Sequence, residues 1–198
     1  MTSDIAFLSS AVAPTVKNKR RKTAKGGKTK RSTKFQPPLV FINYRHKKSL
    51  DIAGRLRDRL LGVFGGDRVI RDTESFPFGD DFDQTIKTML PKCTTLLTLI
   101  DDDWLKEIKR RAKAKTFDWV VFELELALNL GVRIVPVLVN GSAMPDARSL
   151  PRGLKALATK TAVPLRSGID FHNDVDRIIA VLEQACAQRV TATRSKRK

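Results

Sequence analysis

Two glutamates, Glu123 and Glu125, lie within the apolar stretch Phe117–Leu130. If this stretch is a helix, the side chains three and four positions from Glu123 are all apolar: Trp119, Val120, Leu126 and Ala127. A carboxylate among such neighbours is costly to bury unless it reaches a polar rim or a ligand. Glu125 has a nearly equally apolar setting, so burial alone does not choose between them. The pattern allows a glutamate that acts on a ligand, or an ordinary helix residue exposed at a groove.

Other motifs for nucleotide or metal chemistry are incomplete. No G-x-G-x-x-G follows the first apolar run, which argues against a dinucleotide fingerprint. Gly26–Thr29 ends like a phosphate loop, but Lys22 stands where that loop needs its first glycine, and no strand precedes it. His46 and His172 are the two histidines and have no ligand partners nearby, so we expect no metal site.

The formal net charge of +17 is concentrated at the two ends of the chain. Residues 1–37 hold ten Lys or Arg and one acid, and residues 189–198 hold five and none, which leaves the body at +3. After Leu8 the first segment has few large apolar side chains, so we expect a disordered basic tail. We therefore predict a tail at 1–37, one domain at 38–188 and a second basic tail at 189–198.

The basic tails and the cysteines suggest where the protein works. Lys17–Lys22 holds five bases in six residues, as nuclear-targeting or nucleic-acid patches do. Because no aromatic residue interleaves with the bases, we expect weak non-specific contact with nucleic acid or anionic lipid, or no partner. Cys93 and Cys186 make no disulfide framework, and Cys93 is expected to be a small buried hydrophobe. With no apolar run long enough for a membrane span, we expect a cytoplasmic protein, or nuclear targeting in a eukaryotic host.

The body alternates predicted strands with predicted helices. Apolar or β-branched runs predict strands at Leu39–Tyr44, Asp67–Asp72, Thr94–Ile100, Val132–Val139 and Lys160–Leu165. Helices are predicted after Ser49, which could cap the first of them, after Asp80, at Phe117–Leu130 and at about Asp170–Gln188. Asp101–Lys115 is predicted to be a polar, charged excursion.

This alternation predicts an α/β fold, a flavodoxin-like three-layer sandwich with a five-stranded parallel sheet in the order 2-1-3-4-5. In such sheets ligands bind beyond the carboxyl ends of the strands, at the point where the strand order reverses. Here that rim would be built from residues 44–48, 72–79, 101–115 and 140–145.

Several motifs, in order, resemble those of TIR (Toll/interleukin-1 receptor) domains. The opening strand Val40–Arg45 is similar to the family's F-I-S-Y-R, and Gly79–Phe82 resembles the end of its BB loop. Trp104 follows the third strand, and Trp119 and Glu123 match the W-x-x-x-E of members that cleave NAD. Val135-Pro136-Val137 and Leu150-Pro151 complete a match from about Pro38 to Gln184.

Each of these motifs is weak alone, and their shared order and spacing make the resemblance specific. Three positions depart from the family pattern. Asn43 replaces the usual serine, His46 stands where a second arginine is frequent, and Phe78 takes the place of a proline before Gly79.

The resemblance implies an NAD+ glycohydrolase that releases nicotinamide and ADP-ribose, or a cyclic ADP-ribose. Glu123 would be catalytic and Trp119 would shape the pocket, while Tyr44 and Arg45 would contact the base or phosphates. Asp72, Phe82 and Trp104 would line the site, with NAD+ as substrate and no separate cofactor. Activity would depend on self-assembly, in which the BB loop Thr73–Gly79 reaches a neighbouring TIR domain.

The implied chemistry suits a single carboxylate. Cleavage of the nicotinamide–ribose bond passes through an oxocarbenium-like sugar, whose positive charge a nearby carboxylate stabilises. Nicotinamide leaves from a cationic form, so no general acid is needed to expel it.

Three alternatives stay open. A non-enzymatic TIR scaffold would act through homotypic contacts on the same fold without a working Glu123. An enzyme similar to nucleoside deoxyribosyltransferases would cleave nucleosides and leave NAD intact. A nucleic-acid-binding module would depend on the tails and lose its function when cut to residues 38–188.

Overall fold

The sheet organises the part of the chain that the computed structural model describes, residues 39–45, 48–71 and 82–195. Side chains are described as far as Gln188, apart from Phe82 and Asp83. Five parallel strands pair in the order β2-β1-β3-β4-β5. They are β1 (Val40–Asn43), β2 (Val69–Arg71), β3 (Thr95–Ile100), β4 (Arg133–Val139) and β5 (Val163–Leu165). Each strand falls inside a predicted one, and the predicted order is confirmed.

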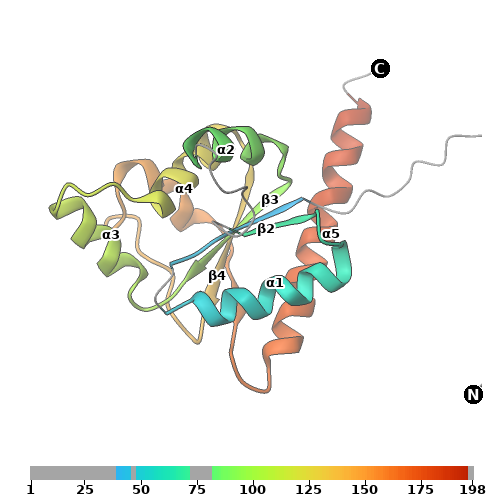
Figure 1. Cartoon of the computed structure of the whole chain (residues 1–198), viewed down its shortest axis with the longest axis horizontal. Helices are drawn as coiled ribbons and strands as arrows, with labels where there is room; N and C mark the ends of the chain where they lie inside the picture. Colours follow the sequence, from blue (N-terminus) through green and yellow to red (C-terminus); the bar gives the residue numbers. More distant parts are fainter. Residues whose placement is uncertain (1–38, 46–47, 72–81, 196–198) are drawn as a thin grey trace, which may run out of the picture. The chain divides into compact units, whose positions relative to one another are not determined.

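Helices cover both faces of this sheet (Figure 1). They are α1 (Leu50–Phe64), α2 (Phe82–Met89), α3 (Trp104–Lys113), α4 (Trp119–Asn129) and α5 (Phe171–Ser195), with 3-10 turns η2 (Leu90–Lys92) and η3 (Arg152–Thr159). One hydrophobic cluster joins the sheet to α1 and α5, and a second joins it to α3, α4 and the 3-10 turns. The three-layer α/β arrangement is therefore confirmed.

Strand alternation decides which side chains enter which cluster. Successive side chains of a strand point to opposite faces of the sheet. In β1, Val40 and Ile42 belong to the cluster with α1 and α5, whereas Phe41 belongs to the cluster with α4. By the same alternation Asn43, two positions after Phe41, points toward α4.

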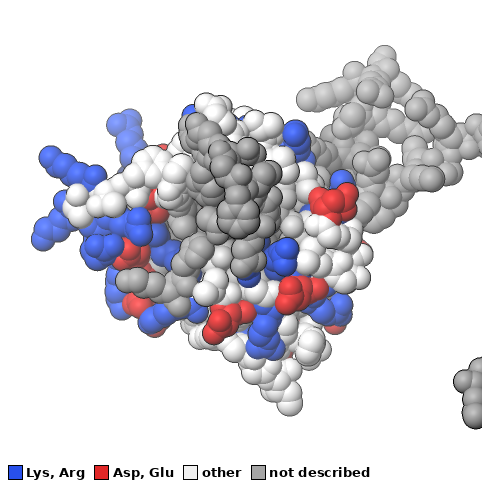
Figure 2. Space-filling model, viewed as in Figure 1, with Lys and Arg blue, Asp and Glu red and all other residues white. Residues whose placement is uncertain are grey.

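The largest departure from prediction is α3, which occupies the middle of the segment predicted to be a polar excursion. Trp104 and Ile108 lie one turn apart and are buried in the second cluster. On the outer side Glu107 accepts hydrogen bonds from Arg110 and Arg111, the i,i+3 and i,i+4 pairs that support a helix. Figure 2 shows the many Lys and Arg side chains gathered there. The prediction of an excursion was wrong for these residues, because it rested on their high charge and overlooked the two apolar side chains one turn apart.

Two further details differ from prediction. Ser49 does stand at the N-cap of α1, but its hydroxyl makes no capping bond and instead donates to Oδ2 of Asp101 at 2.6 Å. The last helix, α5, continues through Ser195, beyond its predicted end at Gln188. Cys93 is buried in the second cluster, as predicted. Within the described ranges, none of the helices is both long and apolar enough to cross a membrane.

Asp174 joins the end of β5 to the first turn of α5. Its fully buried carboxylate accepts hydrogen bonds from the backbone N–H of Arg166 at 3.0 Å and from the Nε and Nη2 of the same residue at 2.8 Å each. The hydrogen bonds from the Arg166 side chain are the main reason why the pKa of Asp174 lies below its usual 3.8. The ionised carboxylate therefore stabilises the folded chain.

We expect Asp174→Asn to lower the free energy of unfolding at neutral pH by about 1–3 kcal/mol, because charge-assisted hydrogen bonds are lost. The pKa is depressed in the folded state, so this stabilisation is present above about pH 4 and is lost as the pH falls through the folded value. Urea unfolding at neutral and acidic pH measures both effects, and the variant should lose less stability on acidification than the wild type. The exposed Asp176, paired with Arg59, supplies the control Asp176→Asn. Equal losses of unfolding free energy in Asp174→Asn and Asp176→Asn would contradict the stabilising role of the Asp174 carboxylate.

Candidate functional site

The two glutamates of α4 point in different directions. Glu123 is 3% exposed, and its Oε2 accepts a hydrogen bond of 2.7 Å from Nδ2 of Asn43 at the end of β1. Glu125 is half-buried and lies against Gly153 of η3, where an added Cβ would collide with the Glu125 carboxylate. Apolar spacing alone left this choice open, while the W-x-x-x-E resemblance favoured Glu123. The structure directs Glu123 toward the sheet.

A chain of buried polar groups surrounds the Glu123 carboxylate. Asn43 and Thr98 are register partners on β1 and β3, and Thr98 Oγ1 donates to Asn43 Oδ1 at 2.8 Å. Asn43 Nδ2 also donates to the backbone oxygen of Val120 at 3.2 Å. Asn43 and Thr98 are 1% and 0% exposed, so water does not compete for these bonds. The network thus joins two strands to the first turns of α4.

Arg45 makes a second connection between the end of β1 and α4. Its Nη2 forms an ion pair of 2.8 Å with Oδ2 of Asp118, and the two side chains are only 10% and 11% exposed. Asp118 is the N-cap of α4, and its Oδ1 accepts from the backbone N–H of Val121 at 3.3 Å. Arg45 therefore anchors the beginning of the helix that carries Glu123. Its buried Nε has no hydrogen-bond partner in the described part of the chain.

The remaining predicted site residues are dispersed. Tyr44 is 3% exposed in the cluster with α1 and α5, on the opposite face of the sheet from Glu123. Trp104, the first residue of α3, is fully buried in the second cluster. Trp119 is 38% exposed one turn before Glu123, with its ring 4.7 Å from that of Phe117.

Several parts of the prediction fall outside the described residues, among them the basic tail at 1–37 with Lys17–Lys22. Asp72 and the loop Thr73–Gly79 lie in the range that the structure leaves undescribed, and so does His46. Phe82 begins α2, but its side chain is not described. Among the predicted residues that are described, the structure gathers Arg45, Trp119 and Glu123 around the start of α4.

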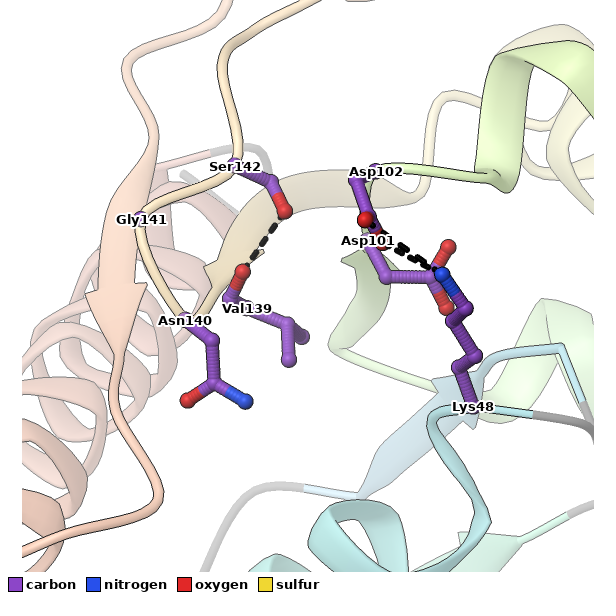
Figure 3. A pocket seen from close by; sticks show the side chains of 7 residues that line it. All are labelled: Lys48, Asp101, Asp102, Val139, Asn140, Gly141 and Ser142. Carbon is purple, nitrogen blue, oxygen red and sulfur yellow. Dashed lines mark hydrogen bonds and ion pairs between the residues drawn. The ribbon is translucent and has the colours of Figure 1, made fainter.

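A hollow of about 410 Å³ opens at the carboxyl ends of β3 and β4 (Figure 3). It is lined by Lys48, Asp101, Asp102, Val139, Asn140, Gly141 and Ser142. All of these residues except Val139, the last residue of β4, belong to the rim predicted from the strand ends, although none of them was singled out. Their only signal in the sequence was their place directly before a helix or after a strand.

The charges around this hollow are mutually satisfied. Lys48 Nζ lies 2.6 Å from a carboxylate oxygen of Asp103 and 3.3 Å from one of Asp102, and these bonds raise the pKa of Lys48. Asp101 accepts from the Ser49 hydroxyl and, at 3.1 Å, from the backbone N–H of Asp103. No group of side chains suited to a metal ion is found in the described ranges. These contacts fix the starts of α1 and α3 at the rim.

Comparison with known proteins assigns this arrangement to a family. A family model described as the TIR domain matches residues 40–180, most of the chain. This chain belongs to the TIR domain family. The matched range includes β1, with its polar end, and the whole of α4. Membership covers both signalling and NAD-cleaving domains.

Solved structures share the fold of this TIR domain. The TIR domains of the activated Roq1 resistosome, which directly recognises the pathogen effector XopQ, match with a TM-score of 0.57 and 12% identity. That match covers 73% of this chain and 99% of the Roq1 chain. A prokaryotic SEFIR domain matches with a TM-score of 0.51 and 18% identity, over 73% of this chain and 92% of that one. At these identities the likeness establishes the fold.

We expect Asp118→Ala to lower the free energy of unfolding by about 2–4 kcal/mol, because it removes an N-cap and leaves Arg45 nearly buried and unpaired. Asp118→Asn keeps a capping oxygen and removes the charge. The stability that this variant loses therefore measures the ion pair separately from the cap. Thermal unfolding of both variants, with amide exchange of the first turn of α4, tests this role. An Asp118→Ala protein as stable as the wild type would contradict it.

Proposed function

We propose that this TIR domain is an NAD+ glycohydrolase in which Glu123 is the catalytic carboxylate. The observation that carries the proposal is the burial of Glu123 against Asn43 at the end of β1. β2 pairs with one edge of β1, and β3 pairs with the other edge. The strand order therefore reverses between β1 and β3. Ligands of open α/β sheets bind at that point.

The proposed reaction needs one carboxylate and one water. The bond between the anomeric carbon and the nicotinamide nitrogen breaks, and its electron pair leaves with the neutral nicotinamide. The positive charge that develops on the ribose is stabilised by ionised Glu123. Water then adds its oxygen to the anomeric carbon and releases a proton, which gives ADP-ribose. Attack by a group of the adenine ring in place of water would give a cyclic product.

Trp119 and Arg45 are the proposed substrate contacts that the described structure brings nearest to Glu123. The Trp119 ring is partly exposed and lies on the same side of α4, where it can form a wall of the pocket. The Arg45 guanidinium could use its unpaired Nε toward a phosphate while Nη2 stays bonded to Asp118. Asp72 and Phe82 complete the proposed lining, whereas Tyr44, on the opposite face of the sheet, and the fully buried Trp104 would support the site from the core.

Assembly is the proposed switch. The similar Roq1 TIR domains belong to an activated resistosome, and we propose that this domain likewise becomes active when copies gather through the loop Thr73–Gly79. A TIR scaffold without NAD cleavage is the second candidate, because it uses the same fold and the same homotypic contacts.

The test is nicotinamide release from NAD+ by the full chain at high concentration or clustered on beads. We expect Glu123→Gln to lower kcat by at least about 100-fold, the effect of losing a group that stabilises transition-state charge. Glu125→Gln is the matched control on the same helix and should cleave NAD+ at the wild-type rate.

Each outcome decides between the candidates. No release by clustered wild-type protein would overturn the glycohydrolase and favour the scaffold. Equal release by wild type and Glu123→Gln would show that Glu123 is the wrong residue. Release of a base from nucleosides with NAD+ left intact would favour the deoxyribosyltransferase-like alternative.

A further inference from the structure

Asn43 occupies a position where the family pattern usually has serine, and the structure gives this departure a chemical consequence. Its side chain is 1% exposed and uses both ends of its amide on neighbours. The amide nitrogen donates to Glu123 Oε2 and to the Val120 carbonyl, while the amide oxygen accepts from Thr98.

The hydrogen bonds of Asn43 determine which way its side-chain amide faces. A flipped amide would place Oδ1 of Asn43 against the Glu123 carboxylate and the Val120 carbonyl, which are both acceptors. The Thr98 hydroxyl can donate or accept, so it would adapt to either direction of the amide. The Val120 carbonyl, which can only accept, therefore sets the direction of the Asn43 amide, and Thr98 holds the amide oxygen in place while an N–H faces Glu123.

We propose that Asn43, directed by the Val120 carbonyl and held by Thr98, is a positioning residue that keeps Glu123 ionised and in one orientation for the ribose. The inference rests on the proposed function, since it assigns how the catalytic carboxylate is maintained. A serine hydroxyl can donate or accept, so it suits a protonated as well as an ionised glutamate. The amide nitrogen can only donate, so it favours the carboxylate form. The bond to Val120 fixes the donor relative to the backbone of the same helix.

The kinetic test compares substitutions of similar shape. Asn43→Asp turns the donor into an acceptor, and we expect kcat to fall by about 10- to 100-fold with KM for NAD+ little changed. Thr98→Val removes the hydroxyl that holds the amide oxygen of Asn43 and should lower kcat by about 2- to 10-fold, whereas Thr98→Ser keeps the hydroxyl and should keep the wild-type rate. Wild-type kcat in Asn43→Asp would overturn the proposal, as would equal losses in Thr98→Val and Thr98→Ser.

A second measurement is independent of catalysis. Asn43→Asp sets two carboxylates against each other and should lower the Tm by several degrees. Adding Glu123→Gln replaces the second carboxylate with an amide that can donate to the first, so the double variant should melt above Asn43→Asp while staying inactive. A double variant that melts no higher than Asn43→Asp would overturn the contact.

The two measurements separate the two proposals. If the double variant melts above Asn43→Asp but the wild type does not cleave NAD+, the proposed glycohydrolase is overturned. The Asn43–Glu123 contact then stands as a structural one. NAD+ cleavage that depends on Glu123 but is unaffected by Asn43→Asp would keep the proposed function and overturn the positioning role.

Discussion

The cost of burying a carboxylate is the constraint on which the site depends. Glu123 is nearly inaccessible to water on a helix whose neighbouring positions are apolar, so it needs a hydrogen-bond donor inside the protein. Asn43 supplies that donor at 2.7 Å, and Asn43 is itself directed by the Val120 carbonyl and held by Thr98. A buried polar network is stable only when each member is satisfied, so the strands and α4 must meet in one register.

The alternation of side chains along β1 assigns opposite tasks to successive residues. Asn43 and Arg45 both reach α4, one at the Glu123 carboxylate and the other at the N-cap Asp118. Tyr44, between them, packs on the other face with α1 and α5. The end of one short strand thereby sets the position of the helix that carries Glu123 and contributes to the core on the opposite side of the sheet. This explains why residues adjacent in the motif do not share one pocket.

The wider rim is held by charges that neutralise one another. Lys48 bridges toward Asp102 and Asp103, and Asp101 accepts from Ser49, so α1 and α3 begin at fixed places beyond the strands. Lys106 of α3 joins this set through an ion pair of 3.1 Å with Asp103, while Arg110 and Arg111 pair with Glu107 on the outer side of the helix. The charged groups of this rim are therefore occupied in pairing with one another. Among the candidate site residues, the chemical proposal rests on Glu123 and its helix.

The sequence by itself determined the positions of the strands, their order in the sheet and the family, because periodicity and motif order are local or sequential properties. It also placed two glutamates in an apolar helix. Their apolar spacing alone did not choose between them, and the W-x-x-x-E resemblance favoured Glu123. Only the tertiary structure directed Glu123 to Asn43, eighty positions away, and Glu125 to Gly153. It also replaced the expected Ser49 cap with a bond to Asp101, 52 positions away, and folded the charged α3 against the core through Trp104 and Ile108. The reason is physical: a side chain's partner is decided by which distant elements pack beside it, and residue spacing along one element carries no record of that.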